Sequence, residues 1–337
     1  MIVTNGDLMS SRHLSIDDCL RGIRERDSAA LGQVITLVES NRSDDRVQAQ
    51  ELLTRLLPLT GGAHRIGISG VPGVGKSTFI ETFGLSLVEG GHRVAVLAVD
   101  PSSSVSKGSI LGDKTRMEKL ALSDDTFIRP SPTGGTLGGV ARKTREAILV
   151  CEAAGYDVVL VETVGVGQSE TAVAEMVDFF LLLSLTGAGD ELQGIKRGIL
   201  ELADLISINK ADGENLEAAE RARAELERAL AILRPKGDDV WTPRVVTSSG
   251  LTGDGLDDIW TIIEEHQTVE SADGALDRRR QKQLLGWMWS LVDEGLRSAV
   301  RENPRVAATL ADLENDVLEG RTTPTAAAEN ILNAFKG

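Results

Sequence analysis

Cysteine, histidine and aromatic residues are scarce in this sequence of 337 residues, which has 2 cysteines, 4 histidines and 3% aromatic residues. Cys19 and Cys151 lie far apart, and neither belongs to a CxxC pair. A disulfide framework or a Cys/His zinc site is therefore not expected. The N-terminus also lacks a basic segment followed by an apolar one. We therefore expect a protein of the reducing cytoplasm.

Positive charge is in deficit as well, because 36 Lys and Arg residues face 51 Asp and Glu residues, a net charge of −15. Nucleic-acid coats and binders of anionic membranes need basic patches, so neither partner is expected. No apolar run approaches the about 18 residues of a transmembrane helix. Apolar residues still make up 41% of the chain, too many for a disordered protein. The length predicts about two domains.

Three zones differ in their hydrophobic pattern. Residues 1–62 show only helical spacing, beginning with a capping-box-like Ser15 and Asp18. Residues 63–270 alternate short β-branched runs with longer helical ones, and residues 271–337 are helical again. The last zone carries a wide apolar stripe from Leu284 to Val300, and its final helix is expected to turn Leu332 inward. We predict an N-terminal helical extension, a central α/β domain and a C-terminal helical arm with these boundaries.

Seven segments of the central zone are predicted to be strands. Several are apolar on both faces, as in parallel strands that helices cover on each side. Alternating strands and helices predict a doubly wound α/β domain with a mostly parallel sheet. The predicted strands are 65–69, 93–99, 126–129, 157–162, 178–185, 205–209 and 244–248.

A phosphate-binding loop follows the first predicted strand and matches G-x-x-x-x-G-K-[ST]. Its glycines let backbone N–H groups close around phosphate oxygens, and the helix that follows points its positive end at the anion. The lysine is expected to reach the β- and γ-phosphates, and the serine hydroxyl to bind Mg²⁺. The domain is therefore predicted to be a P-loop NTPase. The loop comprises Gly70, Val71, Pro72, Gly73, Val74, Gly75, Lys76, Ser77 and Thr78.

A base-reading motif ends the strand at 205–209. The carboxylate of Asp212 is placed to accept hydrogen bonds from the N1 and N2 donors of guanine, which adenine lacks. The motif therefore favours GTP over ATP. A second loop after the next strand is expected to flank the base from its far side. The two motifs comprise Asn209, Lys210 and Asp212, and Ser248, Ser249 and Gly250.

A third motif begins where the strand 157–162 ends in Glu162. This carboxylate is expected to hold the hydration shell of Mg²⁺, where ordinary small GTPases have aspartate. The backbone N–H of Gly165 is placed to sense the γ-phosphate, so that the following loop switches on hydrolysis. Gln168 is a candidate for orienting the attacking water.

Two further carboxylates are candidates for the metal or the water. Asp100 ends the strand 93–99, and Asp113 lies in the segment that follows. The sequence does not rank one as metal ligand and the other as water-positioning group. The predicted catalytic residues are Lys76, Asp100, Asp113 and Glu162, and the predicted metal ligands are Ser77, Asp100 and Glu162.

A glycine-rich, charged loop follows the strand 178–185, at the edge of the sheet where open α/β folds bind ligands. We interpret it as a mobile loop. Its candidate residues are Asp190, Glu191, Lys196 and Arg197.

The motifs together resemble one family, the MeaB/ArgK GTPases associated with methylmalonyl-CoA mutase. They are GVPGVGKST, LAVDPSS, LGDKTRM, RPSPTGGTLGGVARKTRE, VETVGVGQSE, GAGDELQGIKRGI and NKAD, and the resemblance spans about residues 15–337. The resemblance places the chain in the SIMIBI branch of P-loop proteins, which includes the metal-inserting GTPases for hydrogenase and urease.

The resemblance implies binding of GTP, GDP and Mg²⁺, with GTP hydrolysis that is slow without a partner. It implies that the protein is a chaperone of the adenosylcobalamin-dependent methylmalonyl-CoA mutase, which gates cofactor loading and protects or reactivates the mutase. The C-terminal helical zone resembles a dimerisation arm, so a homodimer is expected.

Four alternatives remain open on the residues alone. The partner could be a related B12-dependent acyl-CoA mutase. A transport-associated ATPase or kinase would need ATP specificity and a phosphoryl acceptor. A nickel-delivery GTPase would need a Cys/His metal site, for which the cysteines and histidines are too scattered. A non-enzymatic module would bind the nucleotide without turnover.

Overall fold

The computed structural model describes residues 15–99, 117–130, 137–163, 169–186, 197–233 and 240–336. The chain divides into two compact units, Met1–Arg280 and Gln281–Gly337. The predicted division into three parts stays a prediction.

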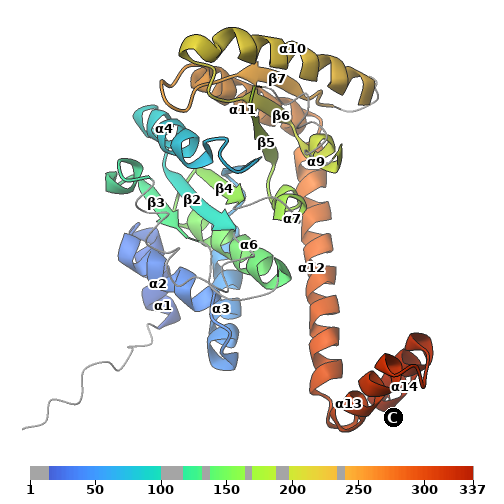
Figure 1. Cartoon of the computed structure of the whole chain (residues 1–337). Coiled ribbons are helices and arrows are strands. Elements are labelled where there is room, and N and C mark those ends of the chain that lie inside the picture. The colour runs from blue at the N-terminus through green and yellow to red at the C-terminus, as the bar shows by residue number, and fades with distance from the viewer. Residues whose placement is uncertain are drawn as a thin grey trace, which may run out of the picture. The chain divides into compact units, whose positions relative to one another are not determined.

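The first unit is built on a parallel sheet, for which seven strands lie within the described residues (Figure 1). The order β3-β2-β4-β1-β5-β6-β7 places β1 in the middle, and every neighbouring pair is parallel. All seven predicted strands are confirmed. Their bounds are β1 His64–Gly70, β2 Val94–Val99, β3 Thr126–Arg129, β4 Val158–Thr163, β5 Phe179–Ser184, β6 Leu205–Ile208 and β7 Arg244–Thr247.

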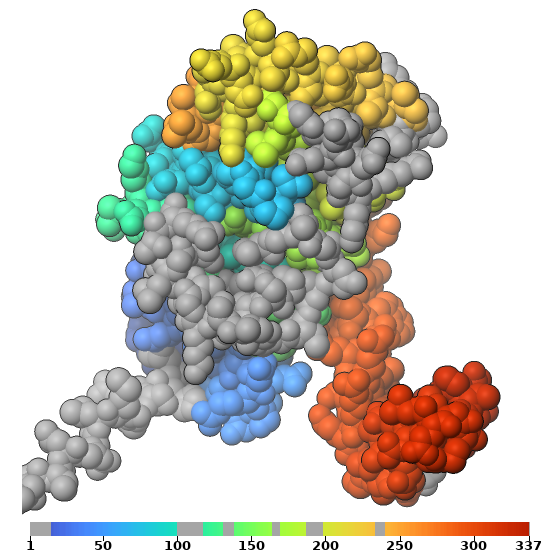
Figure 2. All heavy atoms as spheres, in the orientation of Figure 1, coloured from blue at the N-terminus to red at the C-terminus, as the bar shows by residue number. Residues whose placement is uncertain are grey.

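Helices cover both faces of this sheet, which explains why β2, β4, β5 and β6 are buried along their whole length. One face packs against α4 (Lys76–Glu89) and α11 (Leu256–Ala272). The other packs against α6 (Leu137–Ala153), α7 (Ser169–Ala174), α9 (Arg197–Leu202) and α10 (Leu216–Leu233). Helix α10 packs beside β6 and β7 (Figure 1), and Figure 2 shows it in yellow on the surface at the top of the view. The described part of this unit also contains three short 3₁₀ turns: Leu57–Leu59, Leu120–Leu122 and Gly213–Asn215.

The N-terminal helices belong to the core on the α6 side. They are α1 (Ile16–Arg24), α2 (Ser28–Val38) and α3 (Ser43–Leu56). The predicted capping box is confirmed, because the Asp18 N–H donates to Ser15 Oγ at 3.1 Å. Helix α3 ends at Leu56 because Pro58 stops the α-helix, and the half-exposed Leu57 begins the 3₁₀ turn.

The second unit is helical, as predicted. It contains most of α12 (Ala275–Glu302), together with α13 (Pro304–Leu318) and α14 (Pro324–Lys336). Leu332, expected to face inward, is 48% exposed, so that expectation was wrong. The apolar stripe of α12 is exposed as well, including Leu285 and Trp289 at 59% and 60%. None of the described helices is both long and apolar enough to cross a bilayer.

Candidate functional site

The phosphate-binding loop connects β1 to α4 at the carboxyl edge of the sheet. Its glycines have backbone conformations that other residues rarely adopt, with φ of 157° at Gly70, 81° at Gly73 and 95° at Gly75. A Cβ at Gly70 would lie 2.5 Å from the carbonyl oxygen of Leu183 on β5. The loop therefore needs glycine both for its turn and for its fit against the sheet.

Lys76 begins α4 and bends back over this loop. Its Nζ donates to the carbonyl oxygen of Gly70 at 2.8 Å. Burial lowers the pKa of Lys76, and the negative charges of Glu162 and Glu170 oppose that shift. The ammonium is therefore held against the loop, and the negative charges of two carboxylates act on it.

Asn209, after β6, connects the phosphate loop to the loop that is predicted to flank the base. Its Nδ2 donates to the carbonyl oxygen of Val74 at 2.8 Å, and its Oδ1 accepts from the backbone N–H of Gly250 at 3.0 Å. Lys210, with φ of 60°, donates to the carbonyl oxygen of Gly73 at 2.8 Å. Three loops far apart in sequence thus form one rim at the carboxyl edge.

The carboxylate of Asp212 is held in place by the serine loop. Ser249 Oγ donates to Asp212 Oδ2 at 2.5 Å and accepts the backbone N–H of Leu251 and Thr252 at 3.2 and 3.1 Å. Ser248 is buried, and its hydroxyl bonds that of Ser207 at 2.6 Å. The Ser248 side chain therefore supports the loop from inside, while Ser249 orients the carboxylate.

The groups available to a cation are oxygen atoms, the donors that Mg²⁺ prefers. Glu162 is buried near the end of β4, and Ser77 lies in the first turn of α4. Next to Glu162, Thr163 Oγ1 donates to Ser69 Oγ on β1 at 2.9 Å. No cluster of three His, Cys, Asp or Glu side chains suited to a metal occurs among the described residues. A soft, thiolate-rich or imidazole-rich metal site is therefore not seen in this part of the chain.

Several predicted site residues lie outside the described residues. Arg197 is the first residue of α9, but its side chain also lies outside the description. The others are Asp100, Asp113, Gly165, Gln168, Asp190, Glu191 and Lys196. Their roles stay predictions.

Two residues near the site were missed in the sequence. Thr82 Oγ1 donates to the carbonyl oxygen of Gly250 at 2.6 Å and so fixes the serine loop to α4. Its position one turn after Thr78 was the available signal. Glu170 is buried and its charge acts on Lys76, yet its place in the run Gln168-Ser-Glu170 was the only hint.

The sequence of this chain matches known GTPases over most of its length. Residues 31–305 match the sequence profile of the family described as "Methylmalonyl Co-A mutase-associated GTPase MeaB". The chain belongs to the MeaB family. A MeaB-family relative from Caulobacter vibrioides, described as a putative GTPase, is 59% identical over 96% of this chain and 98% of its own. The GTPase ArgK of Escherichia coli is 47% identical over 91% of this chain and 94% of its own.

Solved structures agree with this family membership. The structure titled "LAO/AO transport system kinase" superposes with a TM-score of 0.77 at 38% identity, covering 98% of this chain and 100% of that one. The predicted P-loop fold is therefore confirmed, and so is the GTPase activity, which the relatives share. This MeaB-family protein hydrolyses GTP.

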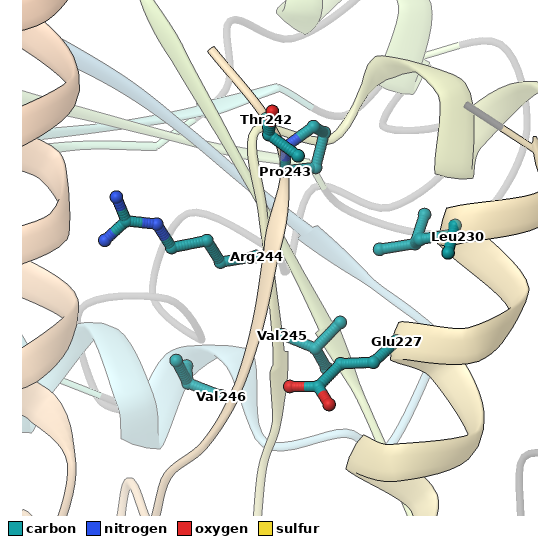
Figure 3. Close-up of a pocket in the computed structure, with 8 residues that line it drawn as sticks. Glu227, Leu230, Thr242, Pro243, Arg244, Val245 and Val246 are labelled. Atoms are coloured by element: carbon teal, nitrogen blue, oxygen red, sulfur yellow. The ribbon is translucent and has the colours of Figure 1, made fainter. Parts of the chain in front are cut away.

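A separate cavity of about 400 Å³ lies between α10 and the edge strand β7. Leu230 and Glu227 extend from α10 toward Val245 (Figure 3). Its charged groups are already paired: Glu227 accepts from Arg223 at 2.7 Å, and Arg244 pairs with Glu265. The cavity shares no lining residue with the nucleotide site and offers no free charge for catalysis.

Proposed function

We propose that this GTPase binds GTP and GDP at the carboxyl edge of its sheet, with the phosphates in the loop Gly70–Thr78. Asp212 reads the guanine, and Ser248–Gly250 flank its far side. The observation that carries this proposal is the pair of hydrogen bonds from Asn209 to Val74 and Gly250. Because one side chain fixes both loops, the spacing between phosphate and base is set before the nucleotide arrives.

The oxygen donors at the same edge suit Mg²⁺. When bound there, the ion would neutralise part of the phosphate charge. Ser77, Asp100 and Glu162 would hold it, directly or through water. Lys76 neutralises charge that develops on the phosphoryl group. Asp113, or the backbone near Gly165, positions the attacking water, with Gln168 as a further candidate.

The protein's partner is proposed to be an adenosylcobalamin-dependent methylmalonyl-CoA mutase. We infer that GTP hydrolysis gates cofactor loading and protects or reactivates the mutase. The family description supports this partner. So does a mouse relative described as "Methylmalonic aciduria type A homolog, mitochondrial", 48% identical over 95% of this chain and 80% of its own. The segment 187–197 would carry the nucleotide state to the mutase.

The second unit is proposed to be a homodimerisation arm. Its apolar stripe on α12 is exposed in the single chain, and exposed apolar patches mark interaction sites. The protein is proposed to work in the cytoplasm.

GTP turnover by the purified protein, alone and with the mutase, tests this function. We expect slow turnover alone, roughly 10⁻⁴ s⁻¹ as in small GTPases without an activator, and strong acceleration by the mutase. Lys76→Ala is the control for contaminating GTPases. A GTP turnover rate that the mutase leaves unchanged would overturn the partner assignment. A related acyl-CoA mutase would then be the next partner to test.

Asp113→Ala tests which group positions the water. We expect normal GTP affinity and lost turnover, because positioning acts only on the reaction. Unchanged turnover would remove Asp113 from the mechanism.

A further inference from the structure

Helix α7 presses closely on β1, the strand that leads into the phosphate loop. The contact point is Gly67, where an added Cβ would lie 2.8 Å from Val173 Cγ1 and 2.9 Å from Phe180 Cδ2. A third contact, to Val177 Cγ2, would be 3.0 Å. Glycine at this position thus sets how near α7 comes to the sheet.

Glu170 lies on the same face of α7 as Val173, one turn nearer the start of the helix. Since α7 connects the parallel strands β4 and β5, it begins at the carboxyl edge. Glu170 therefore lies at the level of the phosphate loop and is 1% exposed.

A buried carboxylate is costly unless a positive charge or hydrogen bonds compensate it. The negative charge of Glu170 acts electrostatically on the ammonium of Lys76, itself partly buried. Glu162 acts on the same ammonium from the end of β4. The Lys76 ammonium, which is proposed to bind the phosphates, therefore already interacts with Glu170 before any nucleotide binds. Glu170 is proposed neither as a metal ligand nor as a catalytic group.

We propose that Glu170 is a positioning residue that weakens nucleotide binding: its buried carboxylate attracts the Lys76 ammonium and repels the incoming phosphates. This inference rests on the proposed placement of the phosphates at Lys76. The Glu170 carboxylate lowers the affinity for nucleotide, so that bound nucleotide dissociates without an exchange factor. It acts more strongly against GTP than against GDP, because the γ-phosphate adds negative charge.

The substitution Glu170→Gln removes the negative charge and keeps the shape of the side chain. We expect the variant to bind a non-hydrolysable GTP analogue about five- to tenfold more tightly, with a smaller gain of about two- to threefold for GDP. Affinities come from calorimetric titration with Mg²⁺ present, and dissociation rates from chase of a fluorescent GDP. Slower dissociation should account for most of the gain.

Two further variants separate charge from structure. Glu175→Gln removes an equal charge close by in the chain, but its side chain is 65% exposed and 3.7 Å from Arg145. We expect its affinities to match the wild type, and an equal gain there would overturn a specific role for Glu170. Glu170→Asp keeps the charge, and we expect affinities within about twofold of the wild type.

The outcomes distinguish this inference from the proposed function. Wild-type protein that fails to bind GTP would contradict the nucleotide site itself. Wild-type binding with unchanged or weaker binding by Glu170→Gln, or an equal change for GTP and GDP, would overturn the role of Glu170 alone. If thermal unfolding shows that Glu170→Gln does not fold, Glu170→Asp decides, since a loss of affinity there contradicts a carboxylate that opposes binding.

Discussion

The two edges of the parallel sheet use polar side chains differently. At the carboxyl edge, Lys76, Lys210 and Asn209 donate to backbone carbonyls. At the amino edge, Arg280 donates two hydrogen bonds to the Asp178 carboxylate, at 2.9 and 2.7 Å. Arg65 likewise donates two to the Glu152 carboxylate, at 2.7 and 2.9 Å. A side chain that donates to a backbone carbonyl can give up that hydrogen bond and bind a ligand instead. The charges of an arginine–carboxylate ion pair are already neutralised by each other.

The amino-edge pairs also connect distant segments. Arg280, near the start of α12, donates to the carbonyl oxygen of Ala63 at 2.9 Å as well as to Asp178. The backbone N–H of Arg65 donates to the same Asp178 carboxylate at 3.2 Å. This edge is a structural clamp, so substitutions there should change stability, and substitutions at the other edge should change nucleotide binding.

The largest effect is expected from Lys76→Ala, which removes the ammonium that the phosphates would meet. We expect GTP affinity to fall about 100-fold or more, since charge-assisted hydrogen bonds to phosphate are lost. The melting temperature should change little. Exposed Lys119→Ala is the control, and unchanged GTP affinity in Lys76→Ala would remove this lysine from the site.

At the opposite edge, Arg280→Met keeps the side-chain stem and removes the charge. Because the buried Asp178 carboxylate then loses its ion-pair partner and keeps only the backbone N–H of Arg65, we expect a loss of about 3–5 kcal/mol in the free energy of unfolding, measured with urea. GTP affinity of the folded protein should stay within about twofold.

Arg278→Met is the matched control for that change. Arg278, two positions before Arg280, pairs with Asp273, but the side chains of this pair are 64% and 51% exposed. We expect a cost of at most about 1 kcal/mol. Equal costs for Arg278→Met and Arg280→Met would contradict the clamp.

Base specificity should depend on Asp212. In Asp212→Asn an amide donor faces the guanine donors, so we expect about 100-fold weaker GTP binding and improved binding of xanthosine triphosphate. Asp254→Asn, in the neighbouring loop, is the control. A variant that keeps its preference for GTP would show that another group reads the base.

The smallest effect is a pH dependence at the amino edge. Burial, together with the charge of Arg279, lowers the pKa of His266 to about 3. Asp204, Glu270 and Asp178 also face this ring, at 3.8 and 4.0 Å for the first two. The unfolded chain takes up a proton below about pH 6.5 while the folded chain does not, so stability falls as pH drops from 6.5 toward 3.

His266→Leu measures this contribution. We expect wild-type stability to fall by up to about 1.4 kcal/mol per pH unit more steeply than that of the variant between pH 6 and 4. Urea unfolding at several pH values gives both slopes. Identical slopes would show that the carboxylates alone cause the acid sensitivity.

Local sequence was sufficient to predict the strands and the nucleotide motifs. Strands buried on both faces must be apolar throughout, which distinguishes β2, β4 and β5 from the helices around them. The loop Gly70–Thr78 requires glycine at fixed positions, so its spacing is visible without any structure. The apolar stripe of α12, in contrast, looks the same in sequence whether the chain buries it or exposes it.

The sequence by itself determined the parallel α/β fold and the phosphate loop, and it predicts the carboxylate proposed to read guanine, because each depends on neighbours in the chain. Only the tertiary structure decided that Asp178 pairs with Arg280, that α7 packs on Gly67, and that Glu170 is buried where its charge acts on Lys76. These contacts join residues far apart in the chain, and their energy arises from burial. Burial is a property of the packed molecule, and no local spacing of residue types specifies it.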